Sequence, residues 1–194
     1  MGEKEVLVEA MRLLVYLGLT NPKGGNGSIR VDEYRFFITP SGKAKHRLSV
    51  EDLVLYDFSN NTYHGNYKPS IEVYAHAKIY EANPEAKAIL HAHTPLSLAL
   101  IDAGLKDWWV DTTIEIEYSV GKVYIAEPAP PGSTELAVSI AKGVKEGAKV
   151  IVVPRHGVFA WGKNIDDALD AIIAFESTAK YVVVKKMFED KKLQ

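Results

Sequence analysis

Three absences restrict what this chain can be. It has no cysteine, so a structural zinc site, which is normally closed by thiolates, is not expected. Its formal net charge is −2 and it carries no basic stripe, which argues against a nucleic-acid partner. It also lacks an apolar run of the roughly 20 residues that span a bilayer, and it shows no signal-peptide pattern. We therefore expect a cytoplasmic protein that contacts neither membranes nor nucleic acid. The lack of cysteine suits a reducing compartment and equally a heat-resistant protein.

The composition that remains is ordinary for a globular protein. Hydrophobic residues make up 47% of the 194 positions and charged residues 25%, which is enough to build a core covered on both sides. No internal repeat and no linker rich in Pro, Gly or Ser divides the chain. The sequence therefore predicts a single domain over residues 1–194, with a charged C-terminal tail from about residue 185.

Helical and extended segments alternate along the chain. Apolar residues recur at helical spacing over residues 3–18, which predicts a helix ended by Gly18. Further helices are predicted over 71–82 with Ser70 as N-cap, from Pro95, from Ser133 or Thr134 to about Glu146, and after the N-cap Asn164. Strands are predicted over 28–31, 35–39, 53–56, 87–92, 122–126, 150–153 and 158–161. Because several neighbouring strands are linked as hairpins, we expect an α/β fold with three α/β/α layers around a central mixed, largely antiparallel sheet.

The histidine pair in His91-Ala92-His93 is the most informative motif, because it ends an apolar run typical of a buried strand. On a strand, side chains at i and i+2 point to one face, whereas on a helix they would diverge by about 200°. A third histidine, His156, follows a second such run and precedes Gly157, which permits close backbone approach. Three neutral imidazoles with an open fourth position are typical of catalytic zinc. Histidines without such a context are interpreted as surface or structural residues: His46, His64 and His76.

Five short segments follow one another in a characteristic order and spacing. They cover nearly the whole chain from Gly24 to the last helix: Gly24–Arg30, Thr39–Gly42, Pro69–Glu72, His91–His93 and Arg155–Val158. Each segment alone is weak evidence, but five in order are specific. By these segments the chain resembles the class II aldolase/adducin family.

The resemblance implies a metal centre and a phosphate site. His91, His93 and His156 would hold a divalent ion, usually zinc, and Glu72 would be the acid/base residue. Phosphate would be bound by residues of two glycine-containing turns and a serine: Gly25, Asn26, Ser41, Gly42 and Ser70. Backbone N–H groups in such turns and at a helix N-terminus form an anion cradle that needs no cationic side chain.

The implied activity is that of a metal-dependent class II sugar-phosphate aldolase. Such an enzyme reversibly cleaves a ketose 1-phosphate, here one similar to fuculose 1-phosphate, to dihydroxyacetone phosphate and an aldehyde. Glu72 would remove the carbon-bound proton, and the ion would act as a Lewis acid. The family also implies a homotetramer with sites at subunit interfaces, where a tyrosine protonates the aldehyde. The nearest candidates for that tyrosine are Tyr118 and then Tyr124, and the aromatics Trp108 and Trp109 are compatible with an interface.

Two departures from the family pattern bear on the substrate. Ile71 stands where the family aldolase has a second phosphate-binding serine, and the chain shows no obvious counterpart of its C-terminal tyrosine. The first alternative is a methylthioribulose-1-phosphate-type dehydratase. A pentose-phosphate 4-epimerase is less favoured, because it would carry an aspartate near the position of Glu72. A non-catalytic module similar to the adducin head would have lost the histidines that this chain keeps, and a hydrolase using zinc-bound hydroxide is the generic alternative.

Overall fold

One eight-stranded sheet forms the centre of the computed structural model, which describes residues 2–191. The strand order across the sheet is β4-β3-β2-β1-β5-β8-β7-β6. The strands are β1 (Asn26–Arg30), β2 (Arg35–Ile38), β3 (Val54–Asp57), β4 (Thr62–His64), β5 (Ala88–Ala92), β6 (Val123–Ile125), β7 (Val150–Val153) and β8 (Gly157–Gly162). Strands β6 and β7 are parallel and the other neighbouring pairs are antiparallel, so the predicted mixed, largely antiparallel sheet is confirmed.

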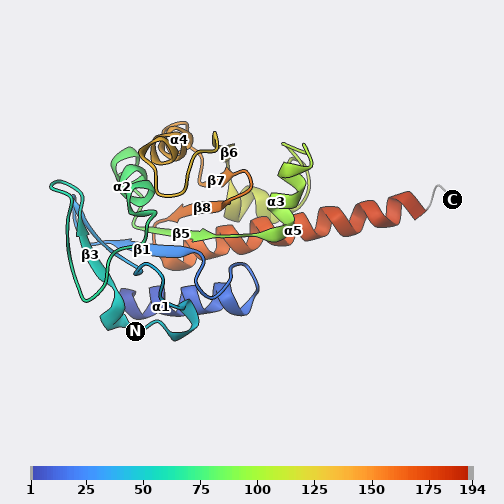
Figure 1. Ribbon diagram of the computed structural model, residues 1–194. Coiled ribbons are helices and arrows are strands. Elements are labelled where there is room, and N and C mark those ends of the chain that lie inside the picture. The colour runs from blue at the N-terminus through green and yellow to red at the C-terminus, as the bar shows by residue number, and fades with distance from the viewer. Residues whose placement is uncertain (1, 192–194) are drawn as a thin grey trace.

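Helices cover both faces of this sheet, which confirms the three layers (Figure 1). One face packs against α1 (Glu3–Tyr16), α3 (Pro95–Asp102) and α5 (Ile165–Lys191), and the other against α2 (Val73–Ala82) and α4 (Thr134–Lys145). Three short helices lie in the connections: η1 (Lys45–Arg47), η2 (Val50–Asp52) and the π-helix η3 (Ile116–Val120). None of the helices within residues 2–191 has the length and apolar character needed to cross a bilayer.

Strand β5 lies between β1 and β8, and all five of its residues are buried. Leu90 and Ala92 belong to the core beneath α1 and α5, whereas Ile89 belongs to the core beneath α2 and α4. The period of two therefore places His91 on the same face as Ile89. Across the sheet, His91 is paired with Asn26 of β1 and with Phe159 of β8. The register thus brings the glycine-rich turn before β1 next to the histidine strand.

The start of α2 differs from the prediction. The helix begins at Val73 with Glu72 as its N-cap, and Ser70 lies before the helix instead of capping it. The Ser70 Oγ accepts a hydrogen bond from the Glu72 N–H at 3.3 Å, and the Ser70 carbonyl accepts one from Val73 N–H at 3.1 Å. These bonds form a turn that precedes the helix, because a serine hydroxyl can satisfy a backbone donor two residues on. Glu72 is consequently held at the helix entrance and not within its first turn.

Other boundaries also differ in instructive ways. Helix α1 ends at Tyr16, and Gly18 follows with a φ of 71°, the left-handed conformation usual after a helix end. Strand β4 was not predicted because its three residues are all exposed and carry no apolar alternation. The Asn164 side chain caps α5 as predicted, by accepting from Asp167 N–H at 2.8 Å. The segment predicted as a charged tail from about residue 185 continues α5 as far as Lys191, and residues 192–194 lie outside the described part.

The two adjacent tryptophans do not form the exposed aromatic patch that the sequence suggested. Trp108 is only 8% exposed, and its ring lies 4.8 Å from that of Phe175 in α5. Trp109 is partly buried and packs against the same phenylalanine at 5.9 Å. They close the local core over α5, since large aromatic rings gain most by burial against one another. Both rings therefore belong to the local core, and their compatibility with an interface stays a prediction.

Candidate metal and anion site

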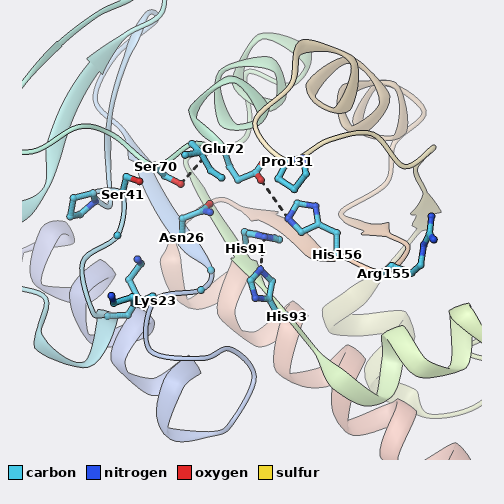
Figure 2. Close-up of a pocket in the computed structure, with 16 residues that line it drawn as sticks. Lys23, Asn26, Ser41, Ser70, Glu72, His91, His93, Pro131, Arg155 and His156 are labelled. Atoms are coloured by element: carbon cyan, nitrogen blue, oxygen red, sulfur yellow. Dashed lines mark hydrogen bonds and ion pairs between the residues drawn. The ribbon is translucent and has the colours of Figure 1, made fainter.

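A cavity of about 520 Å³ opens where six loop and strand ends meet (Figure 2). Its walls come from the turn before β1, the loop after β2, the segment before α2, the end of β5, the loop before α4 and the β7–β8 turn. Nine of the ten predicted site residues line it: Gly25, Asn26, Ser41, Gly42, Ser70, Glu72, His91, His93 and His156. The tenth, Tyr118, is not among the residues that line this cavity.

The three histidines converge on one point of the cavity. Their candidate ligand atoms all lie within 4.8 Å of one another. The Nε2 atoms of His91, in β5, and His93, directly after the strand, are 3.2 Å apart. The His91 Nδ1 lies 3.1 Å from the Val158 carbonyl, and a carbonyl can only accept, so Nδ1 carries the proton. The His91 Nε2 is therefore a free lone pair that points at the other two rings.

The protonation of these rings suits a metal ion. Burial lowers the pKa of His91 well below its ordinary value, lowers that of His93, and lowers that of His156 to about 4. All three are consequently neutral at neutral pH, which is the state that ligates a metal. The His156 Nδ1 is buried and has no hydrogen-bond partner within the described chain. Three neutral imidazoles with one ring nitrogen left unpaired fit a divalent ion with an open coordination position.

Two glycines allow the neighbouring loops to pack closely against the end of strand β5. A Cβ added at Gly157 would lie 2.5 Å from both the Ala92 carbonyl and the His91 Cε1. Gly25 has a φ of 62°, and a Cβ there would lie 2.6 Å from the His91 carbonyl. Both separations are far below van der Waals contact, so a larger residue would push the histidine strand out of place. The glycines in the two motifs thus serve the approach of the loops to β5.

Glu72 is the carboxylate nearest to the histidines. It is 3% exposed, and its Oε1 lies 3.4 Å from the His156 Nε2. Its Oε2 is buried and has no hydrogen-bond partner in the described residues. Burial raises the pKa of Glu72, against the opposing effect of the Gly132 backbone amide. A carboxyl group with a raised pKa and an unused oxygen can exchange a proton with a ligand in the cavity.

Backbone hydrogen bonds hold the turns of the candidate anion site together. Thr39 N–H donates to the Gly27 carbonyl at 3.0 Å, and Ser70 N–H donates to the Thr39 carbonyl at 3.1 Å. Pro40 and Pro69 form an isolated antiparallel bridge between the two loops. Segments more than 40 residues apart in the sequence are in this way fixed on one side of the cavity. Their small residues leave N–H groups and hydroxyls facing a possible anion.

His76 lies beneath Asn26 and fixes the direction of its amide. The His76 Nε2 lies 2.6 Å from the Asn26 Oδ1, which can only accept, so Nε2 carries the proton. Burial lowers the pKa of His76 to about 3, so the ring is neutral and its Nδ1 must accept from Ser28 Oγ at 2.6 Å. The Ser28 Oγ in turn lies 2.8 Å from the Tyr80 hydroxyl, which then donates to it. With its oxygen occupied, Asn26 has only its N–H₂ group available for a ligand.

Cationic side chains also line the cavity, which corrects the expectation of an anion cradle without them. They are Lys23, Lys45 and Arg155. Lys23 and Arg155 are exposed, whereas Lys45 is buried with only 2% of its surface accessible. Two of these residues were within reach of sequence analysis, because Lys23 precedes the glycine turn and Arg155 opens the His156 motif. His76 could have been found from its spacing, one helical turn after Glu72.

Comparison with known proteins agrees with this arrangement. Residues 5–183 match the family described as "Class II Aldolase and Adducin N-terminal domain". The chain belongs to the class II aldolase/adducin family. The resemblance seen in the five sequence segments is thereby confirmed. Members of this family are typically dependent on a divalent metal, and the histidine cluster could hold one.

The similar proteins in this family have different activities. The chain is 34% identical over 185 residues to a 3-oxo-tetronate 4-phosphate decarboxylase of Haemophilus influenzae, covering 93% of this chain and 86% of that protein. It is 33% identical over 181 residues to a methylthioribulose-1-phosphate dehydratase of Methylococcus capsulatus, covering 88% and 87%. An L-fuculose 1-phosphate aldolase structure superimposes with a TM-score of 0.83 at 31% identity, covering 96% of this chain and 87% of that one. The family is therefore shown, while the reaction within it is not.

The two tyrosines considered for the class II aldolase proton donor differ in accessibility. Tyr118 lies on the π-helix η3 and is 80% exposed. Tyr124 packs into the core beneath α4, where a Cβ at Gly143 would lie 2.4 Å from its ring. Tyr124 is partly buried, so Tyr118 is the more accessible of the two to a neighbouring molecule. Ile71, at the position of the missing serine, is 60% exposed at the cavity rim and offers no hydroxyl.

Proposed function

We propose that this protein is a zinc-dependent class II aldolase of sugar phosphates. In the proposed reaction, a ketose 1-phosphate is cleaved between C3 and C4 to an aldehyde and the enediolate of dihydroxyacetone phosphate. The observation that carries the proposal is the joint placement of a buried carboxyl group, three neutral imidazoles and two small-residue turns in one cavity. A reversible aldol reaction needs each of these: a group that exchanges the carbon-bound proton, a Lewis acid and an anchor for the phosphate.

The proposed metal centre consists of His91, His93 and His156. A divalent ion bound there would supply Lewis-acid stabilisation of negative charge on the substrate oxygens. The hydrogen bond from His91 Nδ1 to the Val158 carbonyl orients the ring and leaves its Nε2 to the ion. In the condensation direction, Glu72 is proposed to take the proton from the hydroxymethyl carbon of dihydroxyacetone phosphate, and in cleavage the protonated Glu72 returns it to the enediolate carbon. Its position 3.4 Å from His156 keeps the carboxyl group beside the reacting atoms.

The proposed phosphate site lies beside the histidines, on the part of the cavity wall formed by the turn before β1, the loop after β2 and Ser70. Gly25 and Gly42 supply backbone N–H groups, and Asn26 supplies its side-chain N–H₂ group. Ser41 and Ser70 supply hydroxyls, although Ser70 already accepts a hydrogen bond from Glu72 N–H. A phosphate anchored here would hold the carbonyl carbon and the adjacent carbon atom near the histidines. Binding of the phosphate would thus orient the reacting part of the substrate.

Tyr118 is proposed to act on the site of a neighbouring subunit in a homotetramer. It is 80% exposed and is not among the lining residues of its own cavity, so it can serve only from outside. A tyrosine hydroxyl in that role would protonate the aldehyde oxygen during condensation, and in the cleavage direction the same oxygen would take the proton from the C4 hydroxyl of the ketose. The side chains beside it on and before η3 include Val110 and Ile114, which are 56% and 66% exposed and suit an intersubunit contact.

Two relatives favour a second candidate reaction at the same site. Loss of CO₂ from a 3-oxo-tetronate 4-phosphate breaks its C1–C2 bond and leaves the same three-carbon enediolate that retro-aldol cleavage gives. The 34% identity to a decarboxylase of that substrate makes this the first alternative. A dehydratase of methylthioribulose 1-phosphate would begin with the same removal of a proton next to the carbonyl, followed by loss of hydroxide. All three reactions use the proposed phosphate anchor, with Glu72 as the proton donor to the enediolate in cleavage and decarboxylation and as the proton acceptor in dehydration.

A substrate panel distinguishes these reactions. Purified protein with measured zinc content would be given fuculose 1-phosphate, ribulose 1-phosphate, 3-oxo-tetronate 4-phosphate and methylthioribulose 1-phosphate. We expect dihydroxyacetone phosphate together with an aldehyde from a ketose 1-phosphate. Dihydroxyacetone phosphate with CO₂, or a product lighter by one water, would move the assignment to the decarboxylase or the dehydratase. Absence of turnover on all four by zinc-loaded protein would overturn the proposal.

The relay beneath Asn26 predicts a selective effect on phosphate binding. Ser28→Ala removes the donor to His76 Nδ1, so the ring can adopt the other tautomer and the Asn26 amide can turn its oxygen toward the anion. We expect inorganic phosphate to bind about 10- to 100-fold more weakly, as for one lost hydrogen bond to a charged group. Isothermal titration calorimetry would measure this. Tyr80→Phe is the matched control, because it leaves the Ser28–His76 hydrogen bond in place and should have a much smaller effect. Equal losses in both variants would contradict the relay.

A further inference from the structure

Lys45 is a buried cation that no described acidic residue neutralises. It begins the short helix η1, lies on the wall of the cavity, and is 2% exposed. Its Nζ donates one hydrogen bond, to the Lys43 carbonyl at 3.0 Å. Within residues 2–191, no carboxylate oxygen lies within 4.0 Å of that Nζ. Asp52, the buried acid of the neighbouring η2, is taken by Lys43 and by Ser49.

A buried ammonium without a counterion is unfavourable in the free protein. Burial lowers the pKa of Lys45 to about 8, because it removes the ammonium group from water. At pH 7 the side chain is therefore still mostly protonated. Carrying a charge out of water is tolerated when a partner of opposite charge is present. Because residues 2–191 do not provide that partner, an anion bound in the cavity would stabilise the charged side chain.

The position of Lys45 specifies which part of a ligand it would meet. The Lys45 backbone N–H donates to the Pro22 carbonyl at 2.6 Å, which ties η1 to the loop that leads into the Gly24-Gly25 turn. On the other side, Lys45 follows the Ser41-Gly42 turn by only three residues. The ammonium therefore belongs to the wall formed by the two small-residue turns.

The other two cations of the cavity differ from Lys45. Figure 2 shows Arg155 beyond His156, on the side away from Ser41 and Ser70. Lys23 is exposed, so water already solvates its charge and a ligand would gain less from it. Lys45 alone among the three combines burial, a fixed backbone and a place beside both turns.

We propose that Lys45 is the counter-charge of the substrate's phosphate dianion and that it determines the preference for phosphorylated substrates. The inference rests on the proposed function, in that the anion is the phosphate of the sugar. It also accounts for the exposed Ile71: the hydroxyl missing there removes one neutral donor, and a charge-assisted hydrogen bond from Lys45 replaces it with a stronger one. Selection then follows from charge, because a neutral sugar would leave the buried ammonium unpaired.

The test compares phosphate binding with stability in the full-length, zinc-loaded protein. Lys45→Met keeps the length of the side chain and removes its charge. We expect the affinity for inorganic phosphate, measured by calorimetry at pH 7, to fall by about tenfold or more, while the melting temperature without phosphate stays the same or rises. Lys23→Met is the matched control and should lower the affinity less than about threefold. Unchanged phosphate affinity in Lys45→Met would overturn the inference, whatever the melting temperature of the variant.

Two further measurements separate this inference from the proposed function. Lys45→Arg keeps the charge and should retain phosphate binding, and Lys45→Gln should lose it, so the comparison stands even where one variant folds poorly. Turnover of the substrate panel by the same wild-type preparation tests the lyase assignment by itself. Wild-type protein that cleaves a sugar phosphate, together with a Lys45→Met variant that binds phosphate equally well, would remove the role of Lys45 and leave the lyase assignment standing. Wild-type protein that binds no phosphate and turns over no substrate would remove both.

Discussion

Glu72→Gln is expected to lower kcat by about 10²- to 10⁴-fold, the usual contribution of a positioned general acid or base. The substitution keeps the size of the side chain and removes only its ability to take a proton. The carboxyl group is 3% exposed, has one oxygen without a partner in the described residues, and has its pKa raised by burial. A solvated glutamate would show none of these features, which favour a role in proton transfer. Because glutamine has the same size, we expect turnover to be lost while the fold is kept.

The same variant should keep its zinc and its phosphate affinity. Metal content by atomic absorption and phosphate affinity by calorimetry would be measured beside steady-state turnover of the substrate identified from the panel. Glu135→Gln serves as the matched control, because Glu135 is exposed in the first turn of α4 and is not among the residues that line the cavity. Wild-type turnover in Glu72→Gln would exclude proton transfer by this residue. Loss of zinc with loss of activity would instead assign Glu72 a structural part in the metal site.

The histidine cluster could be predicted from the sequence because its geometry is local. The two-residue spacing at the end of β5 predicts His91 and His93 on one side, and the structure brings them together although His93 directly follows the strand. The approach of His156 was less secure, since it depends on the pairing of β8 with β5, and the ordered motifs supplied that information. Fold class followed from the alternation of hairpins and helices in the same way.

Features that depend on contacts between distant residues could not be predicted. The relay under Asn26 joins Ser28 to His76 across 48 positions, and neither residue carries a local signal for the other. Lys45 looks like an ordinary surface lysine in the sequence, and only the packing of η1 against the Pro22 loop buries it. The burial of Trp108 could not be predicted for the same reason, because Phe175 lies 67 positions after it.

The position of Glu72 illustrates a smaller error with a chemical consequence. Serine and the following residues predict a helix start at Ile71, but local turn bonds at Ser70 postpone it to Val73. Glu72 is then an N-cap whose side chain makes no capping hydrogen bond. Its carboxylate is left free for the cavity, where a first-turn glutamate would face the helix dipole instead.

His93→Ala is expected to have the other large effect, on metal binding and on stability together. Removing one of three imidazoles should reduce zinc from about one per chain to near zero after dialysis, and turnover should fall with it. His46→Ala and His64→Ala are matched controls, because both side chains are exposed and neither lines the cavity. Zinc retained at the wild-type level in His93→Ala would contradict the proposed ligand set.

The melting temperature gives a second test of the proposed metal site that does not depend on activity. A ligand present at about 1,000 times its Kd stabilises the folded state by roughly 4 kcal/mol. For a chain of this size, that corresponds to a rise in Tm of about 8–16 °C. Removing zinc with a chelator should therefore lower the Tm of the wild-type protein by about this amount, whereas His93→Ala should not respond to the chelator. Without metal, the three rings face one another and the buried His156 Nδ1 has no partner among the described residues. Under the proposed ligand set, bound zinc would relieve both conditions only when all three histidines are present.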